Sequence, residues 1–151
     1  MKLLELLTER ESLIVDEASE ALARSQLRHY TSAGATWNRQ RLADLYTLMR
    51  ASVAERNLMP LIEYMDHIAR ERFEAGFAIY EVQTAVNVLE ESIWRQISQS
   101  VPPDQLAEAF GLVSTVLGTA KDTLARSYVT LASQSKAPSL NLNALFQGTT
   151  A

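Results

Sequence analysis

Apolar residues recur every three or four positions along most of this chain, which is the spacing that places them on one face of an α-helix. The clearest run lies between Tyr80 and Val101, where the apolar positions are Val82, Val86, Leu89, Ile93 and Ile97. The same periodicity predicts five helices, over residues 2–30, 37–57, 58–76, 80–101 and 103–134. Alternation with a period of two, which is typical of strands, occurs over no useful length before the extreme C-terminus. We therefore expect an all-α, single-domain bundle of about five helices with a flexible C-terminal tail.

Residues that favour helix ends separate these predicted helices. Small and polar residues from 31 to 36 interrupt the first periodic run and predict a loop. Asn57 is suited to cap the helix that follows it, and Pro60 is tolerated only in the first turn of a helix. Gly76 is suited to end that helix, because glycine adopts the left-handed conformation without strain. The prolines at 102–103 end the fourth helix and start the fifth.

Composition limits the classes of protein to which the chain can belong. Its 151 residues suit one domain, and 47% hydrophobic with 21% charged residues is typical of a folded, water-soluble chain. The absence of cysteine excludes disulfides, thiolate metal sites and cysteine nucleophiles. A net charge of −4 argues against nucleic-acid binding. No apolar run is long enough for a signal peptide or a membrane span, so we expect a cytoplasmic protein with no membrane partner.

The last residues of the chain differ in composition from the rest. After about residue 134, a small, polar and proline-containing stretch predicts a linker. We therefore divide the chain into a helical bundle over residues 1–134 and a linker with a short apolar peptide over residues 135–151. The candidate docking residues of this peptide are Leu140, Leu142, Leu145 and Phe146. Two interpretations stay open: the peptide docks on a protein partner in trans, or it folds back on its own bundle.

The fifth predicted helix carries a line of small residues on one face. They recur at helical spacing and are Ala107, Gly111, Ser114, Gly118 and Ala125. Small residues let a second helix approach closely, a rule best established in membranes and applied here by analogy. Packing against another helix of the same chain is the simpler explanation. The sharper hypothesis is that this face forms the seam of a homodimer.

The chain lacks the sequence patterns of common catalytic centres. It has no Gly-x-Ser-x-Gly motif and no glycine-rich phosphate loop. Neither His29 nor His67 has a second histidine at ligand spacing or completes a Glu-x-x-His pair, so a metal or haem site is unsupported. We therefore expect a protein that is not an enzyme and that has neither a metal nor a cofactor.

Aromatic residues crowd the second to fourth predicted helices and the joints between them. Packing in the core is the ordinary explanation for such residues. A domain that senses a small molecule would instead place its ligand among them, because ligand pockets are largely apolar with a few polar groups. The candidate ligand pocket comprises Phe77, Tyr80 and Trp94.

The stretch from Ile62 to Ile97 carries a more specific pattern. An arginine-rich amphipathic helix ends at Gly76, a short hydrophobic joint follows, and Glu81-Val82 begins an aliphatic helix. This stretch resembles the N-terminal helical domain of the RsbRD-type RsbT co-antagonist proteins. The resemblance implies a five-helix regulatory or sensory module, which in that family usually precedes an output domain.

In this sequence no output domain follows residue 134, so we expect the chain to act on a protein partner in trans. Two classes of function remain. The first is a regulatory or sensor bundle that works through protein contacts, with or without a small ligand. The second is an adaptor or cargo-type protein whose bundle dimerises and whose C-terminal peptide docks it into a larger assembly. A small helical enzyme or haem binder is the least supported alternative.

Overall fold

The computed structural model describes residues 1–136, and within that range the chain is all-α. The elements are α1 (Leu3–Glu9), α2 (Glu11–Arg24), α3 (Arg28–Ala33), α4 (Ala35–Glu55), α5 (Met59–Glu74), α6 (Ile79–Ser100), the short 3-10 helix η1 (Pro103–Gln105) and α7 (Leu106–Lys136). The predicted fold class is confirmed, but the predicted number of helices was wrong: the described residues form seven α-helices rather than about five.

The error lies in the first predicted helix, which is three helices. The backbone leaves the helical conformation at Arg10, where φ is −103° and ψ is 12°, and again at Gln26, where φ is +51°. Beside the first break, the buried Tyr46 hydroxyl donates a hydrogen bond to the carbonyl oxygen of Leu7, so a contact from α4 satisfies an acceptor at the end of α1. The loop expected over residues 31–36 was also wrong, since α3 and α4 are separated by Gly34 alone.

The other predicted boundaries agree with the structure. Gly76 has a φ of +89° and ends α5 in a Schellman motif, in which its N–H donates to Phe73 and the Phe77 N–H donates to Arg72. Before α5, the Asn57 side chain accepts a hydrogen bond from the backbone N–H of Met59 at 3.1 Å. The first turn of α5 also contains a proline, as expected.

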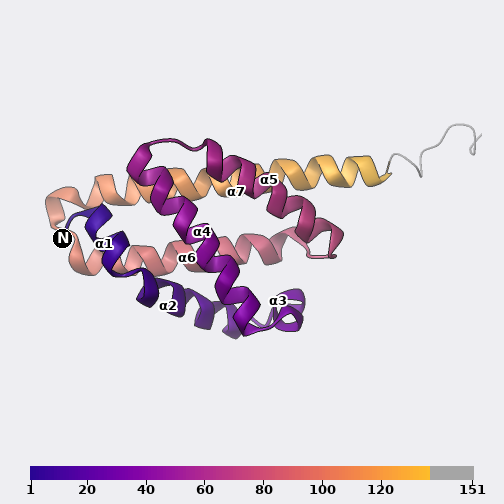
Figure 1. The fold of residues 1–151 in the computed structure, drawn as a ribbon, viewed down its shortest axis with the longest axis horizontal. Helices are drawn as coiled ribbons and strands as arrows, with labels where there is room; N and C mark the ends of the chain where they lie inside the picture. The colour runs from indigo at the N-terminus through magenta and orange to yellow at the C-terminus, as the bar shows by residue number, and fades with distance from the viewer. Residues whose placement is uncertain (137–151) are drawn as a thin grey trace, which may run out of the picture.

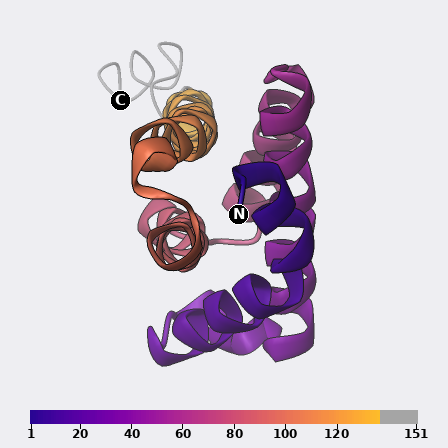
Figure 2. The same cartoon turned by 90° about the vertical axis from the view of Figure 1, so that its left-hand side faces the viewer.

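The helices form two layers. The long helices α6 and α7 lie antiparallel in one layer, and α1, α2, α4 and α5 pack against them (Figures 1 and 2). Within this arrangement α5 packs on α7 and α2 packs on α6. Helix α4 contacts α2 and α5 in its own layer and α6 and α7 in the other. The C-terminal turns of α7 extend past the ends of the other helices (Figure 1).

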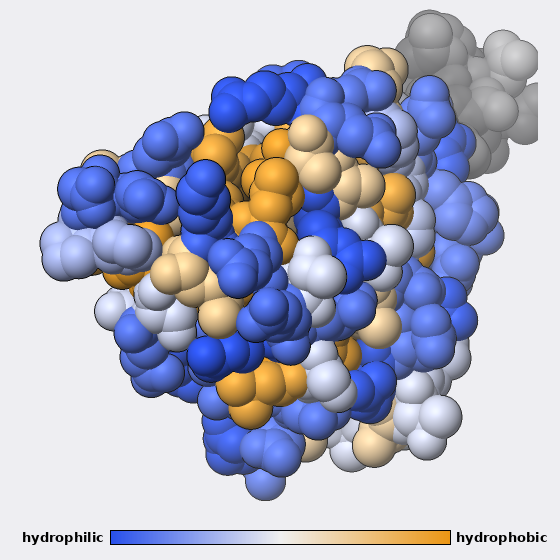
Figure 3. All heavy atoms as spheres, turned by 60° about the vertical axis from the view of Figure 1, so that its left-hand side comes forward, coloured by the Kyte–Doolittle hydropathy of each residue, from blue (hydrophilic) through white to orange (hydrophobic). Residues whose placement is uncertain are grey.

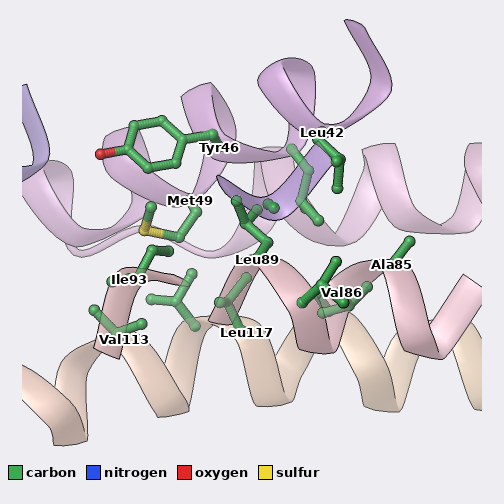
Figure 4. Close-up of a cluster of buried hydrophobic side chains, with 14 of the residues drawn as sticks. Leu42, Tyr46, Met49, Ala85, Val86, Leu89, Ile93, Val113 and Leu117 are labelled. Carbon is green, nitrogen blue, oxygen red and sulfur yellow. The ribbon is translucent and has the colours of Figure 1, made fainter. Parts of the chain in front are cut away.

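The core lies between the layers and is built from the periodic apolar positions. Met49 from α4, Leu89 and Ile93 from α6, and Leu117 from α7 are completely buried and meet in one cluster (Figure 4). Each such side chain contributes about 1.5–3 kcal/mol to folding through removal from water. The same core runs from α1 to α7, so the described helices share one hydrophobic core.

Candidate functional site

An aromatic cluster surrounds Phe77 at the joint between α5 and α6. The ring of Phe77 lies 4.9 Å from that of Tyr30, 5.0 Å from that of His29 and 6.2 Å from that of Trp37, measured between centroids. Phe77 is 8% exposed. The Schellman motif at Gly76 ends α5 and turns the chain immediately before Phe77.

A buried arginine is part of this cluster. Arg72 is 2% exposed, and its guanidinium carbon lies 4.3 Å from the centroid of Trp37 and 5.5 Å from that of Phe77. Its ion-pair partner is the neighbouring Glu71. The guanidinium of Arg41 lies 5.2 Å from Trp37, so Trp37 contacts two cations. Such cation–π contacts stabilise by roughly 0.5–2 kcal/mol each.

A buried carboxylate joins the start of α6 to the start of α3. Glu81 is 1% exposed, and its oxygens accept hydrogen bonds from the backbone N–H of Ala78 at 2.8 Å and of His29 at 3.0 Å. Its Oε2 also lies 2.8 Å from Nδ1 of His29. Burial raises the pKa of Glu81, but the two backbone donors and the His29 ring outweigh it and hold that pKa below its usual value.

The tyrosines of the cluster act as neutral groups at physiological pH. Burial raises the pKa of Tyr128 to about 12, and its hydroxyl donates to the carbonyl oxygen of Phe77 at 3.0 Å. Burial also raises the pKa of Tyr30. The packed aromatic rings and the hydrogen bonds of Tyr128 and Glu81 hold α3, α5, α6 and α7 together. They serve the structure of the joint.

The structure does not bring the three candidate pocket residues together. Tyr80 is 59% exposed on the first turn of α6, whereas Trp94 packs edge-on against Phe110 at 6.1 Å between ring centroids. Tyr80 and Trp94 are separated by roughly 21 Å along α6, given a rise of about 1.5 Å per residue. Phe77 belongs to the separate aromatic cluster described above. A single small-molecule site lined by all three is therefore not formed.

The small residues of α7 lie on its outward side. Ala107 and Gly111 are exposed, and Ser114, Gly118 and Ala125 are half-buried. A Cβ atom placed on Gly111 or Gly118 meets no neighbouring atom within 4 Å. Close packing against another described helix of the same chain therefore does not explain the two glycines. We call this set of five residues the α7 seam.

Charge is nearly absent from the N-terminal half of this helix. Residues 109–120 of α7 contain no charged side chain. Lys121, which follows them, is drawn toward α6, where its Nζ lies 3.2 Å from Glu90 and 3.3 Å from the Asn87 side-chain oxygen. The seam is therefore flanked by a lysine that already has partners on its own chain.

An apolar groove runs beside the seam, between α7 and the C-terminal end of α4. It consists of two adjoining hollows of about 270 and 470 Å³. Its apolar walls come from Leu3, Leu4, Val53, Leu58, Leu112 and Val116. Lys2, Arg56 and Glu108 also line it. Figure 3 shows hydrophobic atoms gathered in a hollow among hydrophilic ones on this end of the molecule. We call this feature the α4–α7 groove.

Sequence reasoning missed the groove and the two buried charges. The groove depends on how α1, α4 and α7 meet, which no local pattern records. Arg72 does carry a signal, because it continues the buried series Leu61, Met65 and Ile68 by four residues. Glu81 carries another, since an acid at the third position of a helix is typical of a capping box.

Other candidate features add no site. The docking residues Leu140, Leu142, Leu145 and Phe146 lie outside the described residues. Within residues 1–136 no group of three or more His, Asp or Glu side chains is placed to hold a metal ion. No helix in that range is both long enough and apolar enough to cross a membrane.

Comparison with known proteins finds one similarity. A family model described as "RsbT co-antagonist protein rsbRD N-terminal domain" matches residues 6–135. The matched range includes nearly all of the described bundle, the aromatic cluster, the α7 seam and most of the α4–α7 groove, whose Lys2, Leu3 and Leu4 precede it. No curated protein and no solved structure matches the chain.

Proposed function

Because the chain belongs to the family of RsbT co-antagonist rsbRD N-terminal domains, we propose that it is a non-enzymatic regulatory domain that acts through protein contacts. The resemblance carried by residues 62–97 is thereby confirmed. The family is regulatory and belongs to stress signalling by partner switching. In such a pathway the domain acts by binding other proteins in trans.

The observation that carries the proposal is the outward face of α7. Surface helices normally present charged and polar side chains to water, yet this face has small, uncharged residues over three turns. Glycine within a helix costs about 1 kcal/mol relative to alanine. Gly111 and Gly118 incur that cost although none of residues 1–136 packs against the position of a Cβ atom on either glycine. A second helix that approaches closely would account for both, and we assign it to a second copy of the chain.

The proposal does not depend on a small ligand. Phe77 is packed into the aromatic cluster, and Tyr80 and Trp94 lie elsewhere on α6. Protein contacts through α7 therefore support the regulatory function better than a pocket at these three residues does. An adaptor function would use the same dimer, with the C-terminal peptide as its second contact.

Gly118→Leu tests the proposed seam. A Cβ atom on Gly118 meets no described atom within 4 Å, so we expect the monomer to keep its fold with leucine there, whereas the added side chain blocks close approach of a second helix. Sedimentation of the unmodified chain should give twice the 16.8 kDa chain mass, and that of Gly118→Leu should give the chain mass alone.

Gly118→Ala is the matched control, because alanine stays small and favours helix more than glycine does. It should remain dimeric. Circular dichroism of both variants reports whether the helices are intact. An unmodified chain that sediments as a monomer, or a folded Gly118→Leu variant that stays dimeric, would show that the seam is not the interface.

A further inference from the structure

We propose that the α4–α7 groove binds the apolar segment Leu140–Phe146 of a second copy of the chain. This inference rests on the dimer proposed above and adds a second contact to it. The groove has about the volume of a site for a short peptide or a large ligand, with adjoining hollows of 270 and 470 Å³. It is open at the surface beside the seam, and Gly111 belongs to both.

The chemistry of the segment suits the groove. Residues 137–151 contain no charged side chain, and four large apolar residues fall within seven positions, at Leu140, Leu142, Leu145 and Phe146. The groove offers apolar walls, whereas its charged residues are of both signs: Lys2 and Arg56 against Glu108. An uncharged apolar peptide therefore buries hydrophobic surface there without removing an unpaired charge of its own from water.

The segment cannot fill the groove of its own chain. The groove runs beside residues 105–116 of the chain. With a rise of about 1.5 Å per helical residue, it lies roughly 30–46 Å from Lys136 at the end of α7. A fully extended chain covers at most about 3.4 Å per residue, so Leu140 reaches about 14 Å from Lys136 and Phe146 about 34 Å. In cis only the last apolar residues would touch the near end of the groove.

An antiparallel dimer removes this difficulty. If two α7 helices pair in opposite directions about the middle of the seam, near residue 116, the partner's Lys136 lies roughly 15 Å beyond the N-terminal end of α7 of the first chain, at about 1.5 Å per residue. Along the helix axis, the groove then lies roughly 14–30 Å from the partner's Lys136. The apolar segment spans about 14–34 Å from Lys136 when extended, which matches the groove. A parallel pair would leave the segment as distant as it is in cis.

The absence of cysteine from the chain allows a clean cross-linking test. Two single-cysteine proteins are needed: Thr115→Cys, which is exposed in the groove, and Asn143→Cys, which lies within the segment. One is labelled with ¹⁵N, and the two are mixed and treated with a short bismaleimide. Mass spectrometry should show a mixed cross-linked dimer. The matched control replaces Thr115→Cys by Glu20→Cys, an exposed position on α2, and should give several-fold less.

A third variant links the cross-link to the apolar side chains. Leu145→Asp, placed in the Asn143→Cys protein, should reduce the mixed cross-link to the level of the Glu20→Cys control. A charge on the segment opposes its burial in an apolar groove.

The outcomes separate this inference from the proposed dimer. Sedimentation of the unmodified chain as a dimer, with a mixed cross-link no stronger than the Glu20→Cys control, would refute the docking of the segment and leave the seam intact. A cross-link within single chains of a Thr115→Cys/Asn143→Cys double variant, without the mixed product, would also refute it. A chain that is monomeric throughout would overturn both proposals.

Discussion

Gly76 is the residue on which the joint between α5 and α6 most directly depends. Its φ of +89° is unfavourable for any residue with a Cβ, and a Cβ there would lie 3.3 Å from Nε2 of His29. Gly76→Ala should therefore lower the free energy of unfolding by about 1–3 kcal/mol. Urea denaturation measures this directly.

Gly111→Ala is the control for that substitution. Gly111 lies within α7, with open space beside it, so alanine should raise the stability of the folded chain by about 0.5–1 kcal/mol. If the two substitutions changed the free energy of unfolding equally, the backbone at Gly76 would not have the strained conformation that the structure shows.

Glu81 should make stability depend on pH. Because its pKa is held below the ordinary value of 4.5, its contribution is complete above about pH 4.5 and is lost as the pH falls through the lowered pKa. Glu81→Gln, which cannot accept from all three donors, should cost about 1–3 kcal/mol at pH 7 and flatten the acid limb of a stability–pH curve. Glu91→Gln, an exposed position on the same helix, should leave that limb unchanged.

These residues show which structural features the sequence alone predicts at single positions. Gly76 was predicted correctly, because a glycine after a periodic run reports directly on backbone conformation. The burial of Arg72 and Glu81 was not predicted, because charged residues are mostly exposed and only their partners make burial tolerable. Those partners, Trp37 and His29, come from α4 and α3.

At the scale of elements, periodicity located the long helices well and the short ones poorly. The runs that became α5, α6 and α7 have strong apolar faces and terminating Gly or Pro residues. The breaks at Arg10 and Gln26 have neither, and contacts from other helices lie beside them: the Tyr46 hydroxyl donates to the Leu7 carbonyl oxygen, and the His29 N–H donates to Glu81. Tertiary contacts therefore decided where a continuous apolar pattern divides into α1, α2 and α3.

Tyr46→Phe tests the contact at the first of these breaks. Loss of the hydroxyl that donates to the Leu7 carbonyl should lower the free energy of unfolding by about 0.5–1.5 kcal/mol. Tyr80→Phe, at an exposed position, should change it by less than about 0.5 kcal/mol. If the two substitutions proved equivalent by thermal or urea unfolding, the hydrogen bond would have no part in holding α1 to α4.

At the scale of the whole molecule, the fold presents an outward helix face on α7 against which no other described helix packs closely at its two glycines. The line of small residues was visible in the sequence, but whether it packs internally was not, since that depends on the arrangement of the two layers. The structure leaves Gly111 and Gly118 in open space. The α4–α7 groove is a property of the assembled bundle and could not be predicted from the sequence.

The most direct test of the proposed contact is a distance between copies of the chain. A single spin label at Asp122→Cys, exposed beside the seam, gives a dipolar signal only when two chains associate. An antiparallel pair centred near residue 116 should place the two labels roughly 20–30 Å apart, from about 18 Å along the helices and 8–10 Å between their axes. A label at Glu20→Cys on α2 should give no such distance. Absence of dipolar coupling at Asp122→Cys would contradict the assignment of α7 as a contact between copies.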